Sequence, residues 1–131
     1  MTRLIDSSAW IEYLRGSDKS VAAAVRRAID DGTAATTDIV VLEILAGSPV
    51  HRTAAWSALL ARCSYLAQQP WDDADAAAAI YRACRRGGHT PRGLADCLIA
   101  AIAIRNDVAV LASDKDFDVI AQHAPLQVVG S

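Results

Sequence analysis

The sequence predicts an α/β fold in three layers, α/β/α, around a central, mainly parallel sheet of four to five strands. Short apolar segments alternate with longer helical segments along the chain, which is the order that builds parallel sheets. Val108 to Ala112 is a continuous apolar run of the kind that parallel sheets bury on both faces. Glycine-containing stops close several helical segments, as at Asp31-Gly32 and Gly87-Gly88.

The predicted elements follow one another without a linker, a repeat or a change of composition, so residues 1–131 are expected to form one domain. The expected strands, in chain order, are Arg3–Asp6, Thr33–Thr37, Tyr65–Ala67, Val108–Ala112 and Leu126–Val129. The expected helices are Ser7–Leu14, a segment from a cap at Asp18 or Ser20 to Asp31, Ile39–Ala46 with Asp38 as its cap, Arg52–Cys63, Asp72–Arg86, Leu94–Arg105 and Asp114–Gln122.

The composition is that of a folded domain outside the membrane. Apolar residues make up 53% of the chain and charged residues 21%, which argues against a disordered chain. The best candidate for a spanning segment, Leu94 to Ile104, is shorter than the roughly 20 residues that cross a bilayer, and Asp96 interrupts it. Asp6 and Glu12 interrupt the region in which a signal peptide would be apolar. We therefore expect a cytoplasmic protein.

The cysteine and histidine residues show no spacing that is typical of metal ligands. The cysteines are odd in number and unpaired in spacing, which argues against a disulfide framework and a zinc knuckle: Cys63, Cys84 and Cys97. The histidines are scattered: His51, His89 and His123. Any metal ion would therefore be held by oxygen.

Three acids follow predicted strands. Asp6 ends the first strand, and Asp114 and Asp116 come directly after the Val108–Ala112 strand. Open parallel sheets bind ligands beyond the carboxyl ends of their strands, so these acids fall where this fold places its chemistry.

Two further acids stand alone in apolar helices. Glu43 is the only charge in Ile39–Ala46, and Asp96 is the only acid in Leu94–Arg105. A helix that is apolar on every side is expected to be buried, and a buried carboxylate without a partner costs several kcal/mol. No basic neighbour stands beside either acid, so a bound cation is the simplest compensation.

Each acid also has a structural explanation when it is taken alone. Asp6 and Asp114 can cap the helices that follow them, and Asp116 can be a first-turn acid favoured by the helix dipole. Glu43 and Asp96 can pair with distant arginines. The joint arrangement of five such acids is harder to explain in this way, and it favours a shared site for a bound cation.

The chain resembles a PIN domain, and more narrowly the VapC ribonuclease toxins of type II toxin–antitoxin pairs. Four blocks in their order and spacing carry the resemblance over essentially the whole chain: Leu4–Trp10, Leu42–Ile44 followed by Gly47, Leu94–Ala101 and Ser113–Phe117. The resemblance implies an endoribonuclease with Mg²⁺ or Mn²⁺ in an acidic pocket, a cognate VapB-like antitoxin, a homodimer, and a structured RNA substrate such as tRNA.

The resemblance also implies roles for single residues. Asp6 and Asp96 match the principal metal ligands of the family, Glu43 and Asp114 match the other two acids of the usual quartet, and Asp116 matches a variable fifth. These last three would hold a second ion or orient the attacking water. Two further positions, often Thr in the family, match hydroxyls that orient carboxylates or a water: Ser7 and Ser113.

Basic residues near these acids are candidates for contact with RNA. Without the five acids, the 15 acidic residues of the chain fall to 10 against 13 basic ones, which leaves a weakly basic remainder. Arg85, Arg86 and Arg92 lie just before Asp96 in the sequence and could follow an RNA backbone. The first two also close a helix, where cations are favoured without any ligand.

Two other readings remain open from the sequence. One is an acid-pocket phosphohydrolase or phospho-receiver domain, although Asp6 is followed by Ser7 and Ser8 instead of the Asp-x-Asp of many phosphatases, and Tyr65–Gln69 has no acceptor aspartate. The other is a binding module whose acids are structural. A metal-dependent RNA cleavage assay separates the three.

Overall fold

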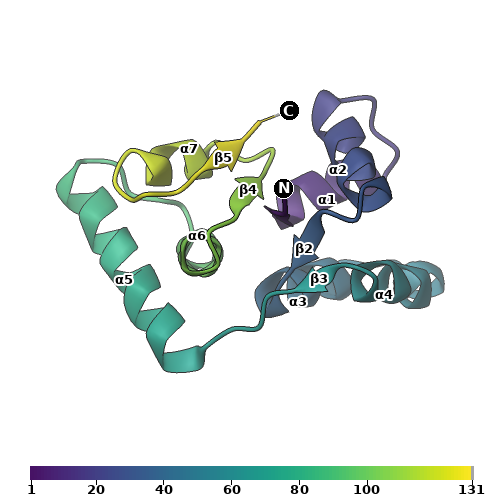
Figure 1. Ribbon diagram of the computed structural model, residues 1–131, viewed down its shortest axis with the longest axis horizontal. Coiled ribbons are helices and arrows are strands. Elements are labelled where there is room, and N and C mark those ends of the chain that lie inside the picture. The colour runs from purple at the N-terminus through teal and green to yellow at the C-terminus, as the bar shows by residue number, and fades with distance from the viewer. Residues whose placement is uncertain (131) are drawn as a thin grey trace.

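In the computed structural model, which describes residues 1–130, five parallel strands form one sheet in the order β3-β2-β1-β4-β5. The strands are β1 (Arg3–Ile5), β2 (Ala34–Thr36), β3 (Ser64–Tyr65), β4 (Ala109–Leu111) and β5 (Val128–Val129). The chain starts at the centre of the sheet, builds outward to β3, and then crosses over to add β4 and β5 on the other side of β1 (Figure 1).

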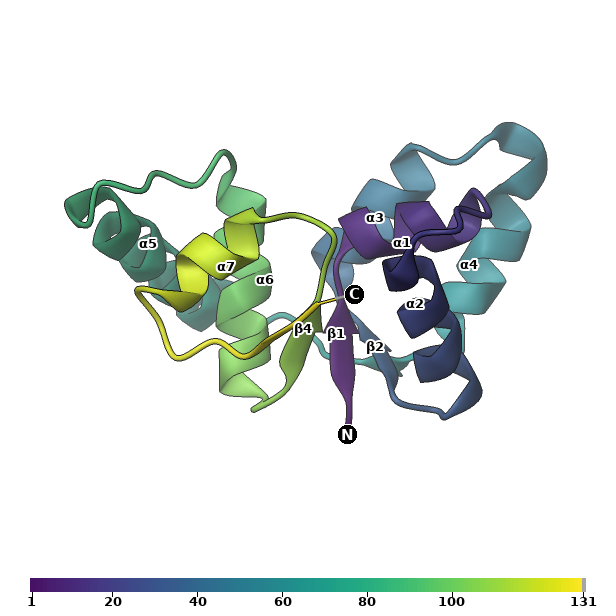
Figure 2. The ribbon, with the colours of Figure 1, turned by 90° about the horizontal axis from the view of Figure 1, so that it is seen from above.

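Helices cover both faces of this sheet. They are α1 (Ser7–Leu14), α2 (Ser20–Asp30), α3 (Asp38–Ala46), α4 (Thr53–Ala61, after the 3₁₀ turn Val50–Arg52), α5 (Pro70–Arg86), α6 (Leu94–Arg105) and α7 (Asp116–Ala121). In Figure 2, α5, α6 and α7 lie on one side of the strands, and α1 to α4 lie on the other. The predicted fold class is therefore confirmed. Among residues 1–130, no helix combines the length and apolar character needed to cross a membrane.

The core sits where the two central strands meet these helices. Leu4 and Val110 are fully buried, as the apolar run in the sequence predicts for a strand covered on both faces. Trp10 of α1 and Phe117 of α7 are the largest fully buried side chains, and they fix both helices to the sheet. The cysteines are free thiols, as expected: Cys63, Cys84 and Cys97.

Several predicted boundaries are wrong by a few residues. Neither Asp18 nor Ser20 caps α2, because Lys19 occupies the cap position and makes no side-chain cap bond. Asp38 is the first residue of α3, not its cap. The predicted helix Asp114–Gln122 starts only at Asp116, because Asp114 remains in the connection that leaves β4.

The expectation that α3 is a buried helix is also wrong. Only Val40 and Ile44 are buried in it, whereas Leu42 is 63% exposed and Glu43 is exposed. The helix packs mainly against α1 and α4 near the β2–β3 end of the sheet (Figure 1). The apolar residues of α3 therefore form surface as well as core.

A buried ion pair joins the two long helices on the opposite face. Asp73 of α5 is 1% exposed, and its carboxylate accepts two hydrogen bonds from Arg105 at the end of α6, at 2.8 and 2.9 Å. The guanidinium and the Gln69 amide hold the pKa of Asp73 below its usual range. The Arg105 guanidinium also donates to the Ala67 carbonyl, so the pair ties α5 and α6 to the chain that leaves β3.

We expect Asp73→Ala to lower the free energy of unfolding by about 2–3 kcal/mol, because it strands the Arg105 guanidinium. Since the folded pKa of Asp73 is depressed, the wild-type advantage is present above the unfolded pKa and is lost as the pH falls through the folded value. Urea unfolding at pH 7 and pH 3 measures both effects. Asp75→Ala, at an exposed position of the same helix, is the control and should change little.

Candidate active site

The site forms where the carboxyl ends of the central strands meet. Ile5 of β1 pairs with Leu111 of β4, so the residues that follow both strands emerge side by side. The Asp6 amide extends the pairing by donating to the Leu111 carbonyl at 2.9 Å. Asp6 thus comes to lie beside the connection that carries Asp114, as the topology rule predicts.

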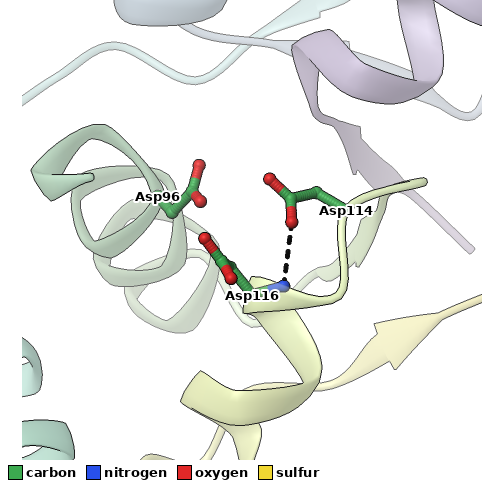
Figure 3. A group of neighbouring side chains, drawn as sticks. All are labelled: Asp96, Asp114 and Asp116. Carbon is green, nitrogen blue, oxygen red and sulfur yellow. Dashed lines mark hydrogen bonds between the residues drawn. The ribbon is translucent and has the colours of Figure 1, made fainter. Parts of the chain in front are cut away.

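Three aspartates gather tightly at this edge. Asp96 projects from the first turn of α6, Asp116 from the start of α7, and Asp114 from the connection before it (Figure 3). Each offers a carboxylate oxygen, and these three oxygens lie within 4.8 Å of one another. Asp114 Oδ1 accepts the Asp116 amide at 2.9 Å, but Lys115 occupies the cap position of α7, so the prediction that Asp114 caps this helix is wrong.

Asp6 is held by Ser8. Both the amide and the hydroxyl of Ser8 donate to Asp6 Oδ2, at 3.1 and 2.7 Å. The same hydroxyl oxygen accepts the amides of Ser113 and Asp114, at 3.0 and 3.2 Å. Ser8 therefore joins the end of β1 to the connection after β4 and sets the spacing between Asp6 and Asp114.

The sequence analysis did not single out Ser8. The available signal was the Asp-x-Ser spacing at the start of a helix, since an aspartate at a cap position binds the amide two residues on. Ser113 contributes its backbone amide to this network. The predicted orienting role of the Ser113 hydroxyl stays a prediction.

Glu43 reaches the site from α3. It accepts a hydrogen bond from the Ser7 hydroxyl at 2.8 Å, which matches the expected orienting role of Ser7 in geometry. Glu43 is exposed and Asp96 is half-buried, and neither has a Lys or Arg ion-pair partner within residues 1–130. The alternative in which each acid pairs with its own arginine is therefore not what the geometry shows.

The five acids act on one another electrostatically. Burial raises the pKa of Asp96 to about 7, with further contributions from the charges of Asp6, Asp114, Asp116 and Glu43, in that order. Burial also raises the pKa of Asp6, against the lowering effect of its hydrogen bonds from Ser8. The cluster therefore carries negative charge that its surroundings compensate only in part.

The donor set fits a hard divalent cation. All five groups are carboxylates, and Mg²⁺ and Mn²⁺ prefer oxygen ligands. Asp116 belongs to the set of three residues whose carboxylate oxygens lie within 4.8 Å of one another, together with Asp96 and Asp114. Asp6 and Glu43 lie near enough to raise the pKa of Asp96 but do not belong to that set of three.

A cavity of about 580 Å³ opens beside these acids. It is lined by Ser8, Ile11, Glu12, Arg92, Ser113, Asp114, Lys115 and Asp116. Of the three arginines proposed for RNA contact, only Arg92 lines it. Arg85 instead lies over the Tyr81 ring, and Arg86 is exposed in the last turn of α5, where the helix dipole favours cations.

Two curated proteins resemble this chain in sequence over almost their whole length. Two ribonucleases are each 43% identical to this chain over 129 residues, which is 95% of this chain and 95% of theirs. They are VapC ribonuclease Mb1587 of Mycobacterium bovis and ribonuclease VapC11 of Mycobacterium tuberculosis.

Solved structures share the fold at low sequence identity. The structure of DNA-bound VapBC2 from Rickettsia felis matches with a TM-score of 0.79 at 15% identity, over 100% of this chain and 99% of that one. The DNA-bound VapBC of Salmonella typhimurium matches with a TM-score of 0.75 at 17% identity, over 99% and 98% of the two chains. The PIN domain family model matches residues 3–122. The chain therefore belongs to the PIN domain family.

Proposed function

We propose that this protein is a metal-dependent endoribonuclease and the toxin of a VapBC-type toxin–antitoxin pair. The observation that carries the proposal is the convergence of five acids from four separate parts of the chain on one sheet edge, without full compensation of their charge: Asp6, Glu43, Asp96, Asp114 and Asp116. The 43% identity to proteins named VapC ribonucleases supports RNA as the substrate.

The acidic residues of the site would have different roles in phosphodiester hydrolysis. Asp96, Asp114 and Asp116 would hold the metal directly with Asp6 beside it, and Glu43 would complete its surroundings. A divalent ion supplies charge neutralisation at the phosphoryl oxygens and lowers the pKa of bound water. The Ser8 hydrogen bonds orient Asp6 and offset part of the rise that burial causes in its pKa. The Ser7 hydroxyl orients Glu43, so that this carboxylate can accept a proton from the attacking water.

The substrate we propose is a structured RNA such as tRNA, cleaved in an exposed loop. Bases in such loops are splayed from the helix and can reach the cavity beside the acids. Arg92 and Lys115 on the cavity wall supply the positive charge that a phosphate backbone requires. Such a substrate is consistent with a cytoplasmic protein.

Two exposed apolar grooves are candidate binding surfaces for a second copy of the chain and for an antitoxin. Leu94 is 65% exposed beside a groove that Ile39 and Leu98 also line, which suits a second copy of the chain in a homodimer. A second groove, lined by Ile11 and Trp56, adjoins Glu43 and suits an apolar segment of a VapB-like antitoxin. An antitoxin bound in this groove would lie next to the acidic active site that it must inhibit.

Asp96→Asn is expected to abolish RNA cleavage and to stabilise the metal-free protein. The raised pKa of Asp96 means that its charge opposes folding, and its removal should add about 1–2 kcal/mol at pH 8 after solvent screening. Because the folded pKa of about 7 lies above the unfolded value, wild-type stability should fall as the pH rises between about 4 and 7. The variant should lack this part of the slope.

Thermal melts with chelator and with Mg²⁺ check this prediction. Mg²⁺ should raise the melting temperature of wild type and raise that of Asp96→Asn much less. Asp75→Asn, at an exposed position of α5, should behave as wild type. A drop of roughly 3–5 kcal/mol in the metal-free Asp96→Asn protein would instead mark a broken structural ion pair.

Expression of the wild-type chain without an antitoxin should arrest growth, and Asp6→Asn or Asp96→Asn should relieve the arrest at equal protein levels. Sequencing of RNA ends after induction should reveal a small set of cleavage sites in exposed loops. Normal growth with abundant, folded wild-type protein would contradict the toxin assignment. RNA cleavage in vitro that persists in excess chelator would contradict the metal requirement.

A further inference from the structure

Arg92 binds two of the acids that the proposed function gives to a metal ion. Its Nη2 lies 2.8 Å from Asp114 Oδ1, and its Nε lies 3.1 Å from Asp116 Oδ2. One guanidinium thus bridges the two carboxylates through adjacent nitrogens. Within residues 1–130, no other Lys or Arg forms an ion pair with any of the five acids.

The position of Arg92 lets its side chain leave the acids without disturbing the fold. The side chain is 77% exposed, whereas the neighbouring Pro91 is buried and anchors the backbone just before α6. Exposed ion pairs of this kind are weak, and a long arginine side chain gains freedom when it is released. Arg92 also lines the cavity beside the acids, so a released guanidinium has a place to go.

A metal ion and this guanidinium compete for the same carboxylates. A divalent cation held by Asp96, Asp114 and Asp116 would bind carboxylates that include the two that Arg92 contacts. Arg92 already binds an oxygen of two of these groups, so the two positive charges would stand close together. Their repulsion in a partly buried site favours one occupant of these carboxylates at a time.

We propose that Arg92 is a counter-ion that the metal displaces, and that the released guanidinium then binds a phosphate of the RNA in the adjacent cavity. This inference rests on the proposed function. In the metal-free protein, Arg92 offsets the repulsion between Asp114 and Asp116. Once a divalent ion takes over that task, Arg92 becomes a phosphate-binding residue, because a guanidinium suits the paired oxygens of a phosphate. The site would thus offer its phosphate contact only when the metal is present.

The displacement can be observed directly by NMR of arginine side chains in the full-length protein. The Arg92 Nε–H signal, identified by its loss in Arg92→Gln, should show a hydrogen-bonded, protected proton without metal. Saturating Mg²⁺ alone should move it to the position of free, exposed arginine. A signal that Mg²⁺ leaves unchanged would overturn the proposal.

Opposite effects on metal binding and cleavage provide a second test. At pH 8, Arg92→Gln should bind Mn²⁺ about three- to tenfold more tightly by calorimetry, the range expected for weak, exposed ion pairs. At saturating Mn²⁺, its kcat/KM on a tRNA mixture should fall about tenfold or more through the lost phosphate contact. Arg27→Gln, at an exposed position of α2, should change neither value, and Arg92→Lys should be intermediate in both.

The outcomes separate this proposal from the proposed function. If wild type binds Mn²⁺ and cleaves RNA but Arg92→Gln binds Mn²⁺ equally or more weakly, only the role of Arg92 is overturned. A variant that binds metal more tightly and cleaves as wild type would overturn the phosphate contact. If wild type binds neither Mg²⁺ nor Mn²⁺, both proposals are overturned.

Discussion

Mutual repulsion among five carboxylates is the constraint on which the rest of this structure depends. A parallel sheet gathers the segments that follow its strands at one edge, and here these segments carry Asp6 and Asp114, which the helices α3, α6 and α7 supplement with Glu43, Asp96 and Asp116. The cost of this repulsion is visible at Asp96. Burial and the neighbouring negative charges raise the pKa of its carboxyl group to about 7. A site that keeps these negative charges together without full compensation favours the binding of a cation. The same repulsion lowers the stability of the metal-free protein.

The fold holds the acids in place with contacts that lie just outside the cluster. The pairing of β1 with β4 brings two chain segments together that are far apart in sequence, and the Ser8 hydroxyl joins them again beyond the strand ends. Trp10 and Phe117, both fully buried, anchor the two helices that begin at the site. The acids therefore cannot relax apart without disturbing core packing.

The sequence predicted those features that depend on local pattern and on topology. The bounds of α1 and α6 agree with their predicted ranges, because periodicity and a sharp strand-to-helix boundary mark them. The meeting of Asp6 with Asp114 followed from the strand ends alone. The exposure of Glu43 was missed, because an apolar helix at the end of a sheet has the same pattern as a buried one. Whether the outer side of such a helix is covered depends on distant elements or on a partner protein, which the local sequence does not specify. Leu42 on the outer side of α3 is exposed.

Long-range hydrogen bonds were the least predictable part. Ser8 acts across more than a hundred residues of sequence, and the Arg92 ion pairs depend on how α7 begins. Asp116, a variable position by resemblance, lies within the closest group of oxygens because α7 starts at that residue and not at Asp114.

Anomalous diffraction from crystals of this protein grown with Mn²⁺ tests the central claim most directly. We expect a manganese peak among Asp96, Asp114 and Asp116, with Asp6 beside it. Protein with the Asp96→Asn substitution should show a much weaker peak under the same conditions. A saturated crystal with no peak at this edge of the sheet, or with its peak elsewhere, would contradict the account.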